Sequence, residues 1–242
     1  MPVFYALLLA HLAADFLQPA ALVRWTKQSV NGLFVHTAIY TVLTAIVLAG
    51  YGHYWWLWIM VLGFSHFILD HFKYLLGTKL SLSGFYIFVV DQSMHIGIIA
   101  LLVFGGALAE QPPSPFLALV SDYWQTLPLL AGYVAGTFGA SILIFEAGRT
   151  FAPQSHNTEP DYGRDGGNAV VVLKGRVTGM IERAVAMTLI LAHLYYLVPF
   201  SFTVSTYQLF RGRGTNAAKR LKTELAISML SAIVIGVALI FL

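Results

Sequence analysis

The chain has 242 residues, of which 58% are hydrophobic and only 10% are charged, and its formal net charge is +3. A soluble domain usually carries about 25% charged residues, so this composition favours an integral membrane protein. There is no cysteine, which excludes disulfides, thiolate metal ligands and thiol nucleophiles. The basic residues lie in short connections between apolar segments, a distribution that encodes membrane topology and argues against a nucleic-acid partner.

Seven apolar stretches predict an all-α integral membrane protein with six to seven transmembrane helices. They cover residues 3–22, 31–50, 54–76, 84–106, 127–148, 178–208 and 223–242. We expect an N-terminal four-helix bundle in residues 1–107 and an extracytoplasmic loop at 108–126. A C-terminal membrane part follows at 127–242, with a polar cytoplasmic loop at about 149–177. Because no lysine or arginine precedes the first stretch, we expect a retained helix rather than a cleavable signal peptide.

Positive charge orients these stretches. The first, third and fifth connections carry lysine or arginine, and the second and fourth carry none. This alternation predicts an extracytoplasmic N-terminus and a cytoplasmic location for the basic connections. The sixth connection, "RGRGTNAAKRLK", is also basic and breaks the alternation if residues 178–208 cross the membrane once. We therefore favour six full spans, with 178–208 entering the membrane and returning near Pro199; seven simple spans are the alternative.

Polar residues recur within the apolar stretches at helical spacing. In "HLAADFLQ", His11, Asp15 and Gln18 are spaced i, i+4, i+7, which predicts a polar stripe on one helical face. "HFILD" and "DQSMH" repeat the i, i+4 pairing of histidine with aspartate, and "FVHTAIY" adds a further histidine. With the predicted orientation, the four histidines and three aspartates of these motifs lie about 8 to 17 Å from the cytoplasmic helix ends. The pattern predicts one polar site in the N-terminal helices, open to the cytoplasm.

An unpaired aspartate at that depth costs about 2.5 to 3.5 kcal/mol on insertion scales, and a divalent cation would remove the cost. Carboxylates and neutral imidazoles are common ligands of zinc, manganese and iron. We predict one or two such ions, held by His11, Asp15, His36, His66, Asp70, Asp91 and His95, with Asp15, Asp70 and Asp91 as catalytic carboxylates. Predicted supporting or substrate-binding residues are Gln18, Lys27, Lys73, Gln92, Glu182 and Arg183. The alternative is that each His-Asp pair only fixes helix packing.

The chain resembles a family of bacterial polytopic membrane proteins known as domain of unknown function 3307. The resemblance rests on "HLAADFLQ", Lys27, "VHTAIY", "HFILDHFK", "DQSMH" and, near residue 180, "GRVTGMIER", in that order. It extends over essentially the whole chain. The resemblance implies a multi-pass protein of the bacterial cytoplasmic membrane and brings no established activity with it.

Several functions are compatible with such a site. We favour a metal-dependent hydrolase that acts on a lipid-like or amphipathic substrate, in which the ion activates water and a spare aspartate accepts its proton. The alternatives are a metal-ion or proton transporter, a bis-histidine haem protein, and a structural or assembly protein. The outer halves of the first four helices lack matching polar residues, which argues against transport. The HExxH pattern of zinc proteases is absent.

Overall fold

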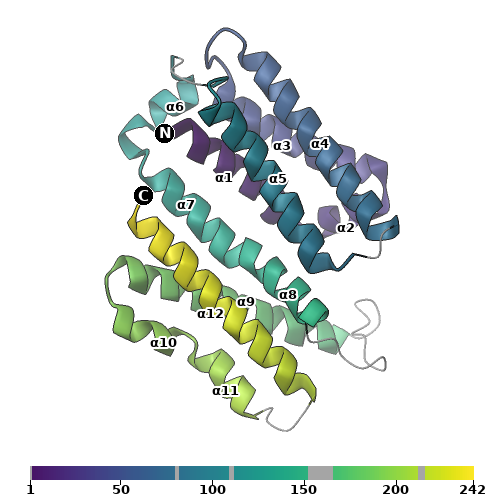
Figure 1. The fold of residues 1–242 in the computed structure, drawn as a ribbon, viewed down its shortest axis with the longest axis vertical. Helices are drawn as coiled ribbons and strands as arrows, with labels where there is room; N and C mark the ends of the chain where they lie inside the picture. The colour runs from purple at the N-terminus through teal and green to yellow at the C-terminus, as the bar shows by residue number, and fades with distance from the viewer. Residues whose placement is uncertain (1, 80–81, 109–111, 152–165, 212–215) are drawn as a thin grey trace. The chain divides into compact units, whose positions relative to one another are not determined.

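A computed structural model describes residues 2–79, 82–108, 112–151, 166–211 and 216–242 (Figure 1). Within these ranges the chain forms helices and turns and no strand, so the predicted all-α class is confirmed. Four helical segments are long and apolar enough to cross a membrane: Val30–Leu48, Gly84–Phe104, Thr126–Phe151 and Arg220–Ile240. The chain divides into two compact units, residues 1–134 and 135–242.

Unit 1 is built around α1 (Pro2–Phe16), α3 (Val30–Leu48), α4 (Trp55–Lys79) and α5 (Gly84–Phe104). α1 packs against α3 and α5, and α4 packs against both of these helices as well (Figure 1). The other elements are α2 (Ala20–Gln28), α6 (Pro115–Leu119), the short helix Ser121–Tyr123 and α7 (Thr126–Val134). Since α1, α3, α4 and α5 alternate in direction, the second half of α1 lies beside the first half of α3.

The first predicted span is shorter than expected. α1 ends at Phe16, and α2 begins at Ala20 after a bend that contains Pro19. Proline disfavours helical backbone in the residue before it, which accounts for the break at this position. The prediction that Gln18 continues the helical stripe of His11 and Asp15 is therefore wrong, because Gln18 lies in the bend.

Apolar side chains fill unit 1 on the side of the N-terminus of α1. Leu7, Leu48, Leu62 and Ile99 come from four different helices and are each at most 1% exposed. The helical turns that carry Leu7 and Leu48 lie before residue 11 on α1 and after residue 36 on α3. The core therefore occupies the opposite half of the unit from the predicted polar site.

Unit 2 contains a π-helical turn, η2 (Ala135–Gly139), followed directly by α8 (Ala140–Phe151). It continues with α9 (Gly166–Leu191), the short helix Tyr195–Leu197, α10 (Val198–Ser201), α11 (Thr203–Arg211) and α12 (Asn216–Ile240). α12 packs against α8 and α9. Because α9 begins at Gly166, helix covers residues 166–177 of the stretch predicted to be a cytoplasmic loop.

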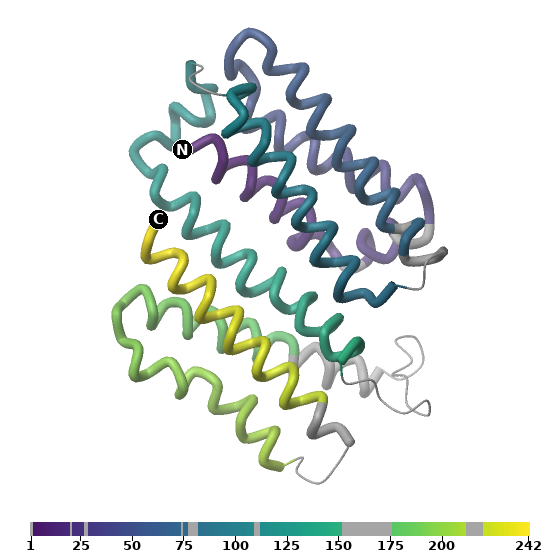
Figure 2. The backbone as a smooth tube through the Cα atoms, viewed as in Figure 1, coloured from purple at the N-terminus to yellow at the C-terminus, as the bar shows by residue number. Residues whose placement is uncertain are grey.

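The stretch 178–208 is not one helix. α9 ends at Leu191, and the chain turns at His193, whose φ of 58° lies in the left-handed region. α10 and α11 then pack back against α9, so that the chain reverses direction within unit 2 (Figure 2). A reversal at this position is compatible with the favoured topology, in which residues 178–208 return to the side from which they entered; the number of spans stays a prediction.

We predict that Gly32→Ala destabilises unit 1. A Cβ on Gly32 would lie 2.4 Å from the backbone oxygen of Trp25 and 2.7 Å from the backbone nitrogen of Thr26, so α2 would have to move away from α3. The expected loss of stability is about 1 to 3 kcal/mol. Thermal unfolding in detergent checks it, with Gly97→Ala as the matched control because a Cβ there meets nothing within 4 Å. Equal unfolding midpoints for the two variants would contradict the prediction.

Candidate metal centre

The seven predicted ligands converge in unit 1. α1 and α4 each contribute a histidine and an aspartate, α5 contributes another pair, and α3 contributes His36. They form three overlapping triads, in each of which one ligand atom per residue lies within 4.8 Å of the others. The triads are His11, Asp15 and His66; His36, His66 and Asp70; and Asp70, Asp91 and His95. The i, i+4 spacing explains this arrangement, since it places both members of each pair on one helical face.

Four of these ligand atoms, one from each of Asp15, His36, His66 and Asp70, lie close together. The Nε2 atoms of His36 and His66 are 3.1 Å apart, and the Oδ2 atom of Asp70 lies 2.9 and 3.4 Å from them. The Oδ1 atom of Asp15 lies 3.7 Å from His36 and 3.6 Å from His66. A tetrahedron of ligands at about 2.0 to 2.1 Å from a metal ion has edges of about 3.3 Å. These five of the six edges bracket that value, so the spacing of the two histidines from each carboxylate is compatible with a shared ion.

Two buried atoms of this group lack the hydrogen bonds that burial normally demands. Asp15 Oδ1 and His66 Nδ1 are buried and form no hydrogen bond with any described residue. An uncompensated buried polar atom costs roughly 1 to 3 kcal/mol. A cation between the nitrogen and carboxylate lone pairs would compensate Asp15 Oδ1, which faces three histidines at 3.6 to 3.8 Å.

Hydrogen bonding fixes the protonation pattern of His95. Its Nδ1 lies 2.9 Å from the backbone carbonyl oxygen of Asp91, and a carbonyl only accepts, so Nδ1–H is the donor. In a neutral imidazole the other nitrogen, Nε2, then carries the lone pair. Nε2 is buried and makes no hydrogen bond to the described part of the chain. A histidine that donates one N–H to a carbonyl and presents its other nitrogen is the usual arrangement of a metal ligand.

Hydrogen bonding to Gln92 likewise fixes which nitrogen of His11 carries the proton. The Nε2 atom of Gln92 donates to Asp15 Oδ2 at 2.9 Å and to Asp91 Oδ2 at 3.1 Å. Its Oε1 therefore faces His11 Nε2 at 3.3 Å, which must carry the proton. The lone pair of a neutral His11 is left on Nδ1, 3.8 Å from Asp15 Oδ1. Gln92, which the sequence placed among the supporting residues, thus connects the carboxylates of α1 and α5.

Lys73 lies at the edge of the cluster. Its Nζ is 2.6 Å from Asp91 Oδ2, and its side chain is 38% exposed, against 3% for the side chain of Asp91. The lysine extends from the same face of α4 as Asp70, three residues later in the sequence. It therefore pairs with the third carboxylate of the cluster, which is not one of the four tetrahedral ligands.

Tyr40 is a site residue that the sequence reasoning missed. It is 2% exposed, and its ring stacks on that of His66 with centroids 4.2 Å apart and an interplanar angle of 22°. The histidine rings also contact one another, with centroids 4.5 Å apart for His66 and His95. The signal was available, since Tyr40 follows His36 by four residues. Because the imidazole rings contact one another directly, the cluster favours a small ion over a haem held between two histidines.

The remaining predicted site residues are Gln18, Lys27, Glu182 and Arg183. Gln18 Nε2 is buried and makes no hydrogen bond to the residues described. The side chain of Lys27 lies outside the described residues. Glu182 and Arg183 are buried in unit 2, where the Glu182 carboxylate accepts from the backbone nitrogen of Ser205 at 2.9 Å and from its hydroxyl. The predicted contribution of Glu182 and Arg183 to the site stays a prediction.

Arg183 binds the π-helical turn of unit 2. Its Nε donates to the carbonyl oxygen of Gly136 at 2.7 Å and one Nη2–H to that of Thr137 at 2.9 Å. It also donates to the hydroxyls of Ser141 and Ser228. The guanidinium thus connects η2, α8 and α12 to α9, and its fixed fork geometry suits several acceptors at once.

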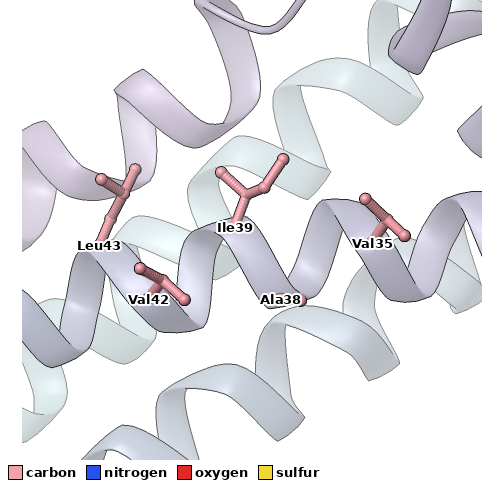
Figure 3. A pocket seen from close by; sticks show the side chains of 5 residues that line it. All are labelled: Val35, Ala38, Ile39, Val42 and Leu43. Atoms are coloured by element: carbon pink, nitrogen blue, oxygen red, sulfur yellow. The ribbon is translucent and has the colours of Figure 1, made fainter.

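An apolar groove runs along α3. It has a volume of about 290 Å³ and is lined by five residues of this helix, Val35, Ala38, Ile39, Val42 and Leu43 (Figure 3). Val35 and Val42 are exposed, whereas His36 turns toward the cluster, so the groove lies on a different face of α3 from the ligand.

These features define an all-helical protein with membrane-length helices and a buried histidine and aspartate cluster in its N-terminal unit. Residues 3–113 match the family described as "Protein of unknown function (DUF3307)", which confirms the resemblance to that family. The match covers every ligand of the cluster, and "GRVTGMIER" lies outside it. No curated protein and no solved structure matches the chain.

We predict that Arg183→Met lowers the stability of unit 2 by roughly 3 kcal/mol, because it leaves buried acceptors of η2, α8 and α12 without their donor. Thermal unfolding in detergent measures the effect. The control is Arg176→Met, which removes an exposed arginine from the same helix. Arg183→Lys should recover little of the loss, because a lysine cannot reproduce the fork. A full recovery by lysine would contradict the assigned geometry.

Proposed function

We propose that unit 1 binds a divalent cation between Asp15, His36, His66 and Asp70. The observation that supports this proposal is the spacing of the two histidine nitrogens from each other and from each carboxylate, since these five distances bracket the edge of a tetrahedron around one ion. Charge supports it as well. Two carboxylates and two neutral imidazoles balance one divalent ion, and an unbalanced carboxylate is expensive in a membrane interior.

The activity that this centre supports best is hydrolysis of a lipid-like or amphipathic substrate. When bound, a zinc, manganese or iron ion would polarise the scissile group and lower the pKa of water to near 7. Asp91 is placed to accept the proton of the attacking water, because its Oδ1 is buried and makes no hydrogen bond within the described ranges. Asp91 can then pass this proton to the leaving group as the scissile bond breaks.

The apolar core supports chemistry over transport. An ion released on the far side of unit 1 would have to pass between side chains such as Leu7, Leu48 and Leu62, which are at most 1% exposed. A transport path needs polar groups or water along its length. The cluster instead faces the end of the unit that carries Lys73 and α2.

We further propose the bacterial cytoplasmic membrane as the location and six spans as the topology. The spans are α1, α3, α4, α5, the helical segment Thr126–Phe151, and α12, with the N-terminus outside. The reversal after α9 supports a cytoplasmic sixth connection, which restores the alternation of positive charge. The metal centre would then open to the cytoplasm.

The topology is testable with single cysteines, because the natural chain has none. We expect cysteines at Leu82 and Lys222 to be shielded from a membrane-impermeant maleimide in intact cells and labelled after lysis. Cysteines at His53 and Ser121 should react in intact cells. All four positions are exposed in the structure. Labelling of Lys222→Cys from outside would show that residues 178–208 cross the membrane and would overturn the six-span topology.

Metal content tests the centre itself. Protein purified in detergent, equilibrated with Zn²⁺ or Mn²⁺ and desalted should retain about one ion per chain by plasma mass spectrometry. The double variant His66→Ala/Asp70→Asn should bind at least roughly 100-fold more weakly, since it loses two ligands. His53→Ala is the matched control, because His53 is an exposed histidine outside the cluster. A folded parent that retains no ion would overturn the metal-centre proposal.

The same samples test hydrolysis. Fluorogenic carboxylic and phosphoric esters in mixed micelles should be cleaved by the parent, inactivated by chelator and restored by added ion. Asp91→Asn should keep the ion and lose about 10²- to 10⁴-fold in rate, the range for general acid-base groups. An ion-loaded parent that cleaves none of these esters would leave a binding centre without the proposed activity.

A further inference from the structure

The cluster contains a second set of ligand atoms that the tetrahedral centre does not use. Asp91 Oδ1 and His95 Nε2 are buried and form no hydrogen bond with described residues. With Asp70, these two residues make the third triad, whose ligand atoms lie within 4.8 Å of one another. Asp70 belongs to both sets and has a second carboxylate oxygen. Its carboxylate is therefore placed to bridge two cations.

Lys73 occupies the neighbourhood of this second set. Its ammonium lies 2.6 Å from Asp91 Oδ2, a short charge-assisted contact. Gln92 Nε2 donates to the same oxygen at 3.1 Å. A metal ion at Asp91 would need a carboxylate oxygen at about 2.0 to 2.2 Å and would meet the ammonium at close range. The ammonium contacts Oδ2 and the free oxygen is Oδ1, so the lysine and a second cation would share one carboxylate and repel each other.

The charges of the cluster favour the lysine. Three carboxylates contribute three negative charges, and Lys73 contributes one positive charge. The remaining two negative charges match one divalent ion with neutral histidines. A second divalent ion beside Lys73 would leave an excess of two positive charges in a buried site, where an uncompensated charge is costly.

We propose that the Lys73 ammonium takes the place of a second metal ion and keeps the centre mononuclear. This inference rests on the proposed metal centre. Without the ammonium, Asp70, Asp91 and His95 form a second cation site next to the first. Lys73 is then a specificity-determining residue for metal stoichiometry.

The test compares ion stoichiometries in the full-length protein with Mn²⁺ as the probe. After equilibration and desalting, the parent and Lys73→Arg should each hold about one ion per chain, because both keep the positive charge. Lys73→Met and Lys73→Gln should each hold about two. Lys73→Met/Asp91→Asn should return to about one ion, which locates the added ion at Asp91.

The outcomes distinguish the role of Lys73 from the metal centre itself. One ion in the parent and one in both neutral variants would overturn the role of Lys73 while the metal centre stands. Two ions in the parent would overturn it as well. No ion in a folded parent would overturn the metal centre itself.

Where the neutral variants are not monodisperse, electron paramagnetic resonance of the parent with two equivalents of Mn²⁺ decides. The signal of a single uncoupled bound ion supports the proposal, and a spin-coupled pair overturns it.

Discussion

The structure of unit 1 depends on the burial of three carboxylates within apolar helices. Asp15, Asp70 and Asp91 lie within contact range of histidines, and Lys73 neutralises only one of them. Burying a charge is tolerated only where an opposite charge or a metal ion compensates it. The helices around the cluster must therefore supply counter-charge, ligand geometry and hydrogen bonds at the same place. This requirement explains why four helices contribute polar side chains at one level and apolar side chains elsewhere.

Much of this arrangement follows from spacing in the sequence. An i, i+4 pair of histidine and aspartate on three helices was enough to predict that the side chains share a face, and basic connections gave the common level. The end of α1 was not predicted correctly, because Pro19 interrupts the helix after Phe16 and moves Gln18 into a bend. Gln92 was named from its position, but its two donated hydrogen bonds depend on how α1 and α5 approach. Tyr40 was missed because aromatic residues in a membrane helix usually pack against lipid or core.

Unit 2 shows where sequence reasoning reaches its limit. "GRVTGMIER" drew attention to Glu182 and Arg183 as charged residues at a helix start, and both are buried. Their partners could not be inferred, because the acceptors of Arg183 are backbone carbonyls of a π-helical turn almost fifty residues earlier. A π-helical turn shifts carbonyls out of the regular hydrogen-bonding pattern and has no clear composition signal. Gly136 allows η2 and α9 to approach closely, since a Cβ at this position would lie 2.5 Å from the sulfur of Met187 in α9.

The identity of the cation beside Asp91 matters because lysine and metal ions neutralise charge in different ways. An ammonium is a point charge on a flexible stem, and it can leave the cluster towards solvent through the exposed part of its side chain. A metal ion would instead hold Asp91 in its coordination shell and remove it as a proton acceptor. A centre with one ion and one lysine therefore keeps a carboxylate available for proton transfer while the charge of the cluster stays balanced. The proposed hydrolysis would use this carboxylate as its proton acceptor.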